Sequence, residues 1–177
     1  MVSIWVTIIV ALISSFSALV ASYITNKASE KRLEIQADLD IKKEKERLKI
    51  EKCERLYLAL LKWQSTIFSV HMNYIMLIDG SMVLSELNKR NNELHNEDDW
   101  LAVQSTSGIY FPDLFKKITK CRGLLKPAND AFFKAKSGRV DDKIKLKNDV
   151  LRSGEEFDIE LNKILLELSG KVEFLKV

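Results

Sequence analysis

The chain has 177 residues, of which 28 are Lys or Arg, 25 are Asp or Glu, six are Gly and two are Pro. This length is room for one domain of ordinary size, and the scarcity of helix-breaking residues favours an all-α fold. Residues 2–26 contain no charged side chain, and this uneven distribution excludes a plain soluble globule.

The N-terminal segment is an apolar run in which Ser and Thr are the only small polar residues. As a helix, residues 2–25 would extend roughly 36 Å, enough to cross a hydrocarbon core of about 30 Å. Trp5 and Tyr23 would lie near the two membrane interfaces, where such rings gather. The pattern predicts a single transmembrane anchor over residues 1–26.

A cleaved signal peptide is the competing interpretation of this segment. Signal peptides carry basic residues before a shorter apolar core and small residues at the cleavage site. Here the core is longer, and Leu19 stands where cleavage after Ala21 needs a small residue, so a retained anchor is favoured. Basic residues follow the span, which predicts an outside N-terminus and a cytoplasmic body. They are Lys27, Lys31, Arg32, Lys42, Lys43 and Lys45.

A charged segment without Gly or Pro comes next, at residues 27–52. Pairs such as Asp38 with Lys42 are four residues apart, a spacing that stabilises a solvated helix. We expect this helix to continue the span without a break and to form a stalk. Coiled-coil pairing of the stalk is the alternative. It would use Ala28, Ile35 and Leu39.

Residues 53–177 are more apolar and predict a cytoplasmic bundle of three to five helices. The first helix has apolar residues on nearly all its faces, which is typical of the central helix of a bundle. One stripe steps by three and four through Cys53, Leu56, Leu60, Trp63, Ile67, Val70, Tyr74 and Leu77. The other faces carry Tyr57, Leu58, Leu61, Phe68, Met72, Ile75 and Met76.

The middle of this region is punctuated by turn and helix-start signals. Gly80 predicts a break, after which residues 81–94 can form a helix and the polar residues 88–99 a loop. A short helix over residues 100–105 would end at Gly108.

Two prolines and a Ser-Gly pair organise the remainder. Pro112 suits the first turn of a helix, and Pro127 predicts that this helix is kinked or divided. Ser137 and Gly138 predict a turn, followed by a long helix over residues 140–169 that Gly170 ends. Its expected core residues are Ile144, Leu151, Phe157, Leu161, Ile164, Leu165 and Leu168. Only the tail, residues 171–177, has any strand-like character.

The sequence offers little chemistry. Scattered glycines exclude a phosphate loop, and Glu155 and Glu156 fit a solvated helix face. Cys53 and Cys121 lack a disulfide or zinc spacing and are expected as buried thiols in a reducing compartment. His71 is expected in the core. The acidic group after His95 consists of Glu97, Asp98 and Asp99, which helix capping explains better than metal binding does. We therefore predict no enzyme, no cofactor and no metal site.

Residues 113–147 carry eleven basic and four acidic side chains. Such a block can meet an acidic protein or acidic helices of the same bundle. Nucleic acid is disfavoured because no binding motif is present, and anionic lipid because the stalk would exceed the Debye length of about 8 Å. The predicted partner-binding residues are Lys116, Lys117, Lys120, Arg122 and Lys126.

The predicted span contains a seam of small residues at helical spacing. Small residues let membrane helices approach closely, so the seam predicts self-association, although single spans often contain Ala and Ser without pairing. The seam consists of Thr7, Ala11, Ser14, Ala18, Ala21 and Thr25.

Together these features favour a single-pass membrane protein that acts as a scaffold or adaptor and forms homo-oligomers. The alternative is a membrane-permeabilising effector, in which the spans assemble into a pore and the body senses a trigger. An enzyme ranks third.

Overall fold

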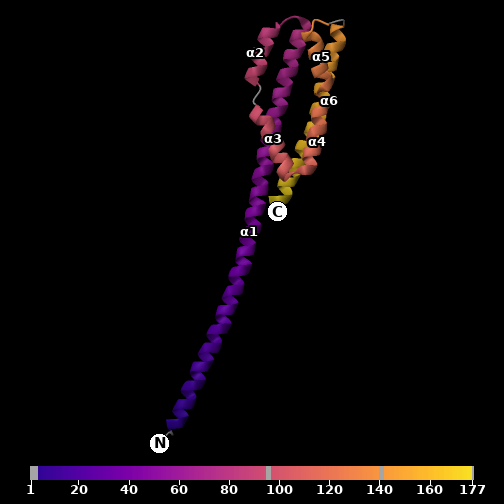
Figure 1. Cartoon of the computed structure of the whole chain (residues 1–177). Helices are drawn as coiled ribbons and strands as arrows, with labels where there is room; N and C mark the ends of the chain where they lie inside the picture. Colours follow the sequence, from indigo (N-terminus) through magenta and orange to yellow (C-terminus); the bar gives the residue numbers. More distant parts are fainter. Residues whose placement is uncertain (1–3, 95–96, 140–141, 177) are drawn as a thin grey trace. The chain divides into compact units, whose positions relative to one another are not determined.

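The computed structural model describes residues 4–94, 97–139 and 142–176, and in these ranges every regular element is a helix (Figure 1). The all-α class is therefore confirmed. The helices are α1 (Ile4–Asp79), α2 (Leu84–Leu94), α3 (Glu97–Tyr110), α4 (Pro112–Gly123), α5 (Lys126–Lys136) and α6 (Lys143–Lys176).

The chain divides into two compact units, residues 1–47 and residues 48–177. The described part of the first unit, residues 4–47, is helical throughout and exposed at every position. It holds one segment that is long and apolar enough to cross a membrane, with a mean hydropathy of 2.4 over 18 residues and no buried side chain.

The second unit is a helical bundle built from the C-terminal part of α1 and helices α2 to α6 (Figure 1). One core cluster centres on Trp63, whose ring centroid lies 4.9 Å from those of both Trp100 and Phe157. The other cluster contains Tyr74, which stacks on Phe132 with centroids 4.4 Å apart. Aromatic side chains from α1, α3, α5 and α6 thus fill the interior, where they contribute most apolar area.

Two glycines end helices as predicted. Gly80 has φ 83°, and after it Ser81 N–H donates to Met76 O at 3.0 Å and Gly80 N–H to Leu77 O at 3.1 Å. Gly138 has φ 71° and closes α5 through the same pair of bonds, made to Lys134 O and Ala135 O. Both ends are Schellman motifs, which require a residue with positive φ after the helix.

The prolines also act as predicted. Pro112 is the first residue of α4, where its missing N–H costs nothing. The helix predicted from Pro112 onward is divided near Pro127, because α4 ends at Gly123 and α5 begins at Lys126. Ser153 of α6 fastens this break by donating its hydroxyl to Leu124 O at 2.6 Å.

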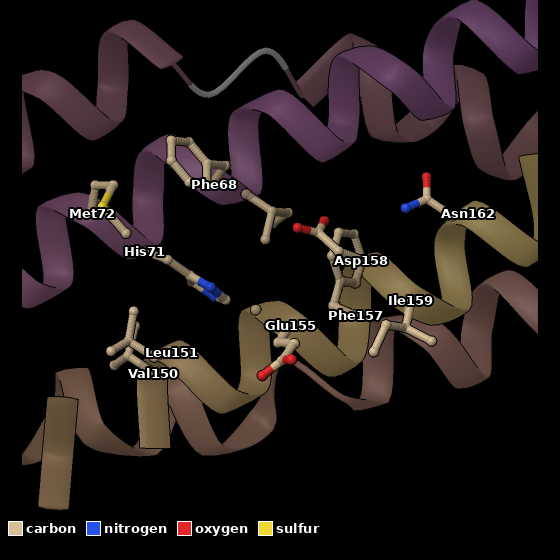
Figure 2. A pocket seen from close by; sticks show the side chains of 12 residues that line it. Phe68, His71, Met72, Val150, Leu151, Glu155, Phe157, Asp158, Ile159 and Asn162 are labelled. Atoms are coloured by element: carbon tan, nitrogen blue, oxygen red, sulfur yellow. The ribbon is translucent and has the colours of Figure 1, made fainter. Parts of the chain in front are cut away.

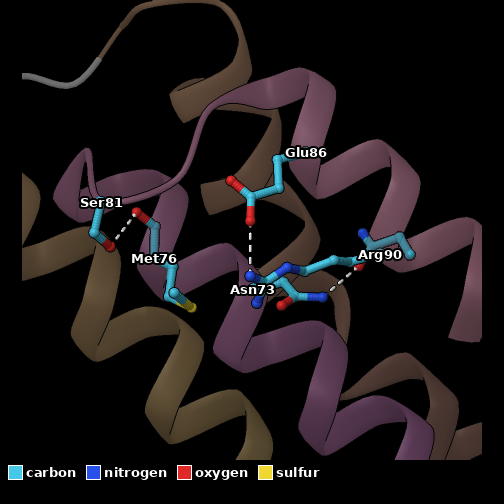
Figure 3. Close-up of polar contacts among 6 residues, drawn as sticks. Asn73, Met76, Ser81, Glu86 and Arg90 are labelled. Atoms are coloured by element: carbon cyan, nitrogen blue, oxygen red, sulfur yellow. Dashed lines mark hydrogen bonds and ion pairs between the residues drawn. The ribbon is translucent and has the colours of Figure 1, made fainter.

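The helix predicted over residues 81–94 is found as α2, whereas the loop predicted over residues 88–99 is wrong at 88–94 and 97–99, which belong to α2 and α3. Polar contacts support α2 (Figure 3). Arg90 pairs with Glu86 one turn earlier at 2.7 Å, and Asn73 of α1 donates to Asn91 Oδ1 at 2.9 Å. The Asn73–Asn91 bond holds this polar helix against α1.

Two predicted helix ends are also wrong. Gly108 lies inside α3, and Gly170 lies inside α6, which continues through the expected strand-like tail to Lys176. Neither glycine has positive φ. A glycine that keeps helical dihedral angles costs only about 1 kcal/mol relative to Ala and does not stop a helix.

The structure also corrects part of the expected core. Leu58 and Phe68 of α1 are 66% and 58% exposed, so the described α1 is not surrounded on all sides. Ile144 and Leu151 of α6 are 71% and 52% exposed. The other residues expected in the core of the last helix are buried, namely Phe157, Leu161, Ile164, Leu165 and Leu168.

Candidate interaction surfaces

The small-residue seam lies on one side of α1. At roughly 100° per residue, Thr7 and Thr25 are separated by five whole turns, and the residues between them stay within an arc of about 80°. Every member is exposed in the first unit: Thr7, Ala11, Ser14, Ala18, Ala21 and Thr25.

Two hydroxyl groups of the seam are hydrogen-bonded to their own helix. Ser14 Oγ donates to Val10 O at 2.9 Å, and Thr25 Oγ1 donates to Ala21 O at 2.8 Å. Because a hydroxyl without a partner is costly in lipid, these bonds let the segment enter a bilayer as a single helix. Apart from these hydroxyl groups, the seam is distinguished by its small side chains, which allow two helices to approach closely.

The predicted basic residues begin on α4, but two of the five are engaged within the bundle. Lys117 forms an ion pair with Glu167 of α6. The Arg122 guanidinium carbon lies 4.6 Å from the ring centroid of Trp100, a cation–π contact between α4 and α3. The Lys117–Glu167 pair fits the interpretation that basic and acidic elements of one bundle face one another.

All five predicted basic residues are exposed, and the other three are Lys116, Lys120 and Lys126. The hydrogen bond from Lys163 is the largest cause that lowers the pKa of Glu160, and the charge of Lys120 also lowers it. Because acidic groups of α6 offset Lys117 and Lys120, the net positive charge of this surface is smaller than the sequence implies. Nothing in the sequence pattern indicated that Trp100 would cover Arg122, because the two residues belong to different helices.

Both thiols are buried and unpaired with each other, as expected. Burial raises the pKa of Cys53, and burial together with Glu160 and Asp158 raises the pKa of Cys121 to about 12. The thiol of Cys121 faces Phe157 O at 3.6 Å. Since the thiolate is the reactive form, neither thiol is suited to nucleophilic chemistry near neutral pH.

A cleft of about 330 Å³ lies between α1 and α6 (Figure 2). His71 points from α1 toward α6, and Phe68 and Met72 stand beside it. Leu151 and Ile159 belong to the α6 wall of the same cleft. The lining is mainly apolar and contains few groups able to perform chemistry.

Polar groups of this cleft connect its two helices. Gln64 donates to Asp158 Oδ1 at 3.1 Å, joining α1 to α6. Burial lowers the pKa of His71, while the negative charge of Asp158 acts in the opposite direction. His71 is buried as expected. The sequence pattern did not predict its neighbours Gly154 and Asp158 on α6, because they lie more than 80 residues away along the chain.

A second cleft, of about 480 Å³, lies where α1, α3, α4 and α6 meet. Its lining includes Tyr110 and Phe111, with Lys49 and Lys171 offset by Asp113 and Glu167. This balanced charge selects neither an anionic nor a cationic ligand.

The described residues contain no group of three or more His, Cys, Asp or Glu side chains able to hold a metal ion. His95 lies outside the described residues, as do the side chains of Glu97, Asp98 and Asp99. No protein-family model, curated protein or solved structure matches the chain.

Proposed function

We propose that this protein is a single-pass membrane scaffold whose N-terminus lies outside and whose helical body, residues 48–177, presents interaction surfaces in the cytoplasm. The apolar segment of α1 carries the proposal. Its most apolar 18-residue window has a mean hydropathy of 2.4, and none of that window is buried among the described residues. Exposed apolar surface of this extent is stable only in lipid or against a partner.

The orientation is supported by the basic residues that follow the span, since Lys and Arg are retained on the cytoplasmic side. Lys27, Lys31 and Arg32 lie within the first two helical turns after the apolar segment. The two buried thiols suit the reducing cytoplasm, where no disulfide is needed.

Self-association through the small-residue seam is part of this proposal. The pore alternative is less well supported, because a pore needs hydroxyl groups that are available to line it. Those of Ser14 and Thr25 are bonded to carbonyl groups of α1. The observed bonding therefore favours an anchor that associates by packing.

We further propose that an acidic protein binds the exposed lysines Lys116, Lys120 and Lys126. The triple change of these residues to Glu should abolish co-purification of such a partner from detergent extracts. Added salt should weaken the wild-type complex, because exposed charge pairs are screened. A partner that is retained by the triple variant would exclude this surface as its binding site.

Alkaline extraction of membranes tests the anchor. The wild-type protein should remain in the membrane pellet at its full mass of 20.4 kDa. A variant with Leu12→Lys and Leu19→Lys should be released, because each central Lys costs about 3 kcal/mol on insertion. A shortened protein that lacks the apolar segment would identify it as a cleaved signal peptide and overturn the proposal.

A further inference from the structure

Large apolar side chains are exposed along the neighbouring outer sides of α1 and α6 in the second unit. We call this surface the α1/α6 face. It consists of Leu58, Leu61 and Phe68 of α1 and Ile144, Leu151, Ile159 and Leu166 of α6. The four α6 residues follow one another at steps of seven, eight and seven, which keeps them within an arc of about 80°.

The cleft between α1 and α6 joins the two halves of this face. Phe68 and Met72 line it from α1, and Leu151 and Ile159 line it from α6 (Figure 2). Three residues of the α1/α6 face, Phe68, Leu151 and Ile159, therefore flank a groove between the two helices. Such a surface accepts side chains from a second pair of helices.

The size of the face matches that of a stable dimer interface. Its seven side chains are between 38% and 72% exposed. If full burial of such a side chain removes roughly 100 Å² from water, their exposed parts amount to about 400 Å². A standard interface buries about 800 Å² on each partner, of which somewhat more than half is apolar. The largest apolar patch on a typical monomer covers roughly 300 to 600 Å² and is often functional.

The position of the basic side chains permits a second copy on this face. Lys117 of α4 contacts Glu167 of α6, and Leu124 O, directly after α4, accepts from Ser153 of α6. Ser153 and Leu151 are two residues apart and thus lie on opposite sides of α6. Two copies that meet through the α1/α6 face therefore keep their basic α4 helices away from each other. Glu155 and Asp158 line the groove, which disfavours anionic lipid as its occupant. The same carboxylates of two copies also repel each other, so apolar contacts must hold the pair together.

We infer that the α1/α6 face binds the same face of a second copy of this chain and forms a two-fold symmetric dimer. The inference rests on the proposed function, because anchoring in one membrane holds two copies in the same orientation at high effective concentration. In such a dimer α1 of each copy lies against α6 of its partner. This placement accounts for an α1 helix that is apolar on nearly all sides although one side is exposed in the single chain.

Sedimentation of the purified full chain in detergent tests the inference. The wild type should be dimeric, and L151K/I159K should raise the dimer dissociation constant about 100-fold, because two side chains at the interface centre become charged. The control is L101K/F133K, which adds the same charge at positions 57% and 61% exposed on α3 and α5. A monomeric wild type, or equal weakening by the control, would overturn the inference.

The same measurement in the A11L/A18L background separates this face from the membrane seam. Weakening by L151K/I159K should persist in that background. If A11L/A18L alone removes the dimer and L151K/I159K does not, the inference fails while the proposed membrane assembly stands. Retention of the dimer by a chain that fails alkaline extraction would instead contradict the proposed anchor and support the face.

Crosslinking in membranes keeps the test valid if L151K/I159K does not fold. The natural thiols Cys53 and Cys121 are buried, so an added surface cysteine is the reactive one. A bismaleimide should join two copies of L151C and should leave L101C monomeric. Absence of the L151C product, or equal yield from both variants, would overturn the inference.

Discussion

Gly154 of α6 leaves the space that the imidazole of His71 needs. A β-carbon at position 154 would lie 3.0 Å from His71 Nδ1, closer than ordinary van der Waals contact. A side chain at position 154 would therefore require the His71 ring to move by a few tenths of an ångström. This contact, the Gln64–Asp158 bond and both core clusters all belong to residues 48–177.

We predict that residues 48–177 fold without the N-terminal segment. The isolated fragment should be soluble, highly helical by circular dichroism and cooperative in urea, because every residue of its two core clusters is retained. Aggregation, or a broad transition without a baseline, would show that the body needs the membrane or a partner to fold.

Gly154→Ala should destabilise this fragment by about 1 kcal/mol, because the added methyl group must displace His71 from a packed site. Gly170→Ala, in the same helix, meets nothing within 4 Å and should stabilise it by roughly 0.5 to 1 kcal/mol through helix propensity. Urea denaturation measures both changes. If Gly154→Ala changes the free energy of unfolding equally in the wild type and in a His71→Ala background, the proposed contact is wrong.

The fragment should also lose stability when the pH falls from 7.5 to 5. Burial lowers the pKa of His71 in the folded state, so the unfolded chain binds the proton more readily. The stabilisation that neutral His71 provides is therefore present above the ordinary histidine pKa of about 6.5 and is lost as the pH falls below it. His71→Gln should reduce this pH dependence, measured by urea denaturation at both pH values. An unchanged dependence would place its origin in other groups.

Local signals predicted the helix boundaries that depend on backbone geometry. Pro112 and Pro127 fix φ and lack a donor, Gly80 and Gly138 adopt positive φ, and each acts where the sequence indicated. Gly108 and Gly170 misled because glycine permits a positive φ without requiring it. The C-terminal part of α2, residues 88–94, was also assigned to a loop, in part because the bond from Asn73 to Asn91 is a tertiary contact.

The candidate surfaces were less predictable for a different reason. Composition identified the basic segment, but only the packing of α4 against α3 and α6 shows that Arg122 and Lys117 are engaged. Periodicity likewise identified Leu151 and Phe68 as apolar without indicating that both are exposed. Apolar patterning indicates that a side chain favours burial, and it does not indicate whether the same chain buries it.

The membrane seam can be tested apart from the body with residues 1–47 fused to a reporter of transmembrane association. A11L/A18L should weaken association by roughly 1 to 2 kcal/mol, because bulk is added where two backbones approach. I9L/V20L leaves the seam unchanged and should associate as the wild type does. Equal signals from both variants would make the segment a plain anchor and would also remove the basis for a pore.

The central claim is that α1 crosses a membrane once and leaves the body in the cytoplasm. Two reporters, one active only in the cytoplasm and one active only outside it, can each be fused after Val177 to measure the location of the C-terminus. We expect cytoplasmic activity, because Lys27, Lys31 and Arg32 follow the span and basic residues are retained on the cytoplasmic side. Activity on the outer side of the membrane would contradict the topology and, with it, the assignment of free thiols to a reducing compartment.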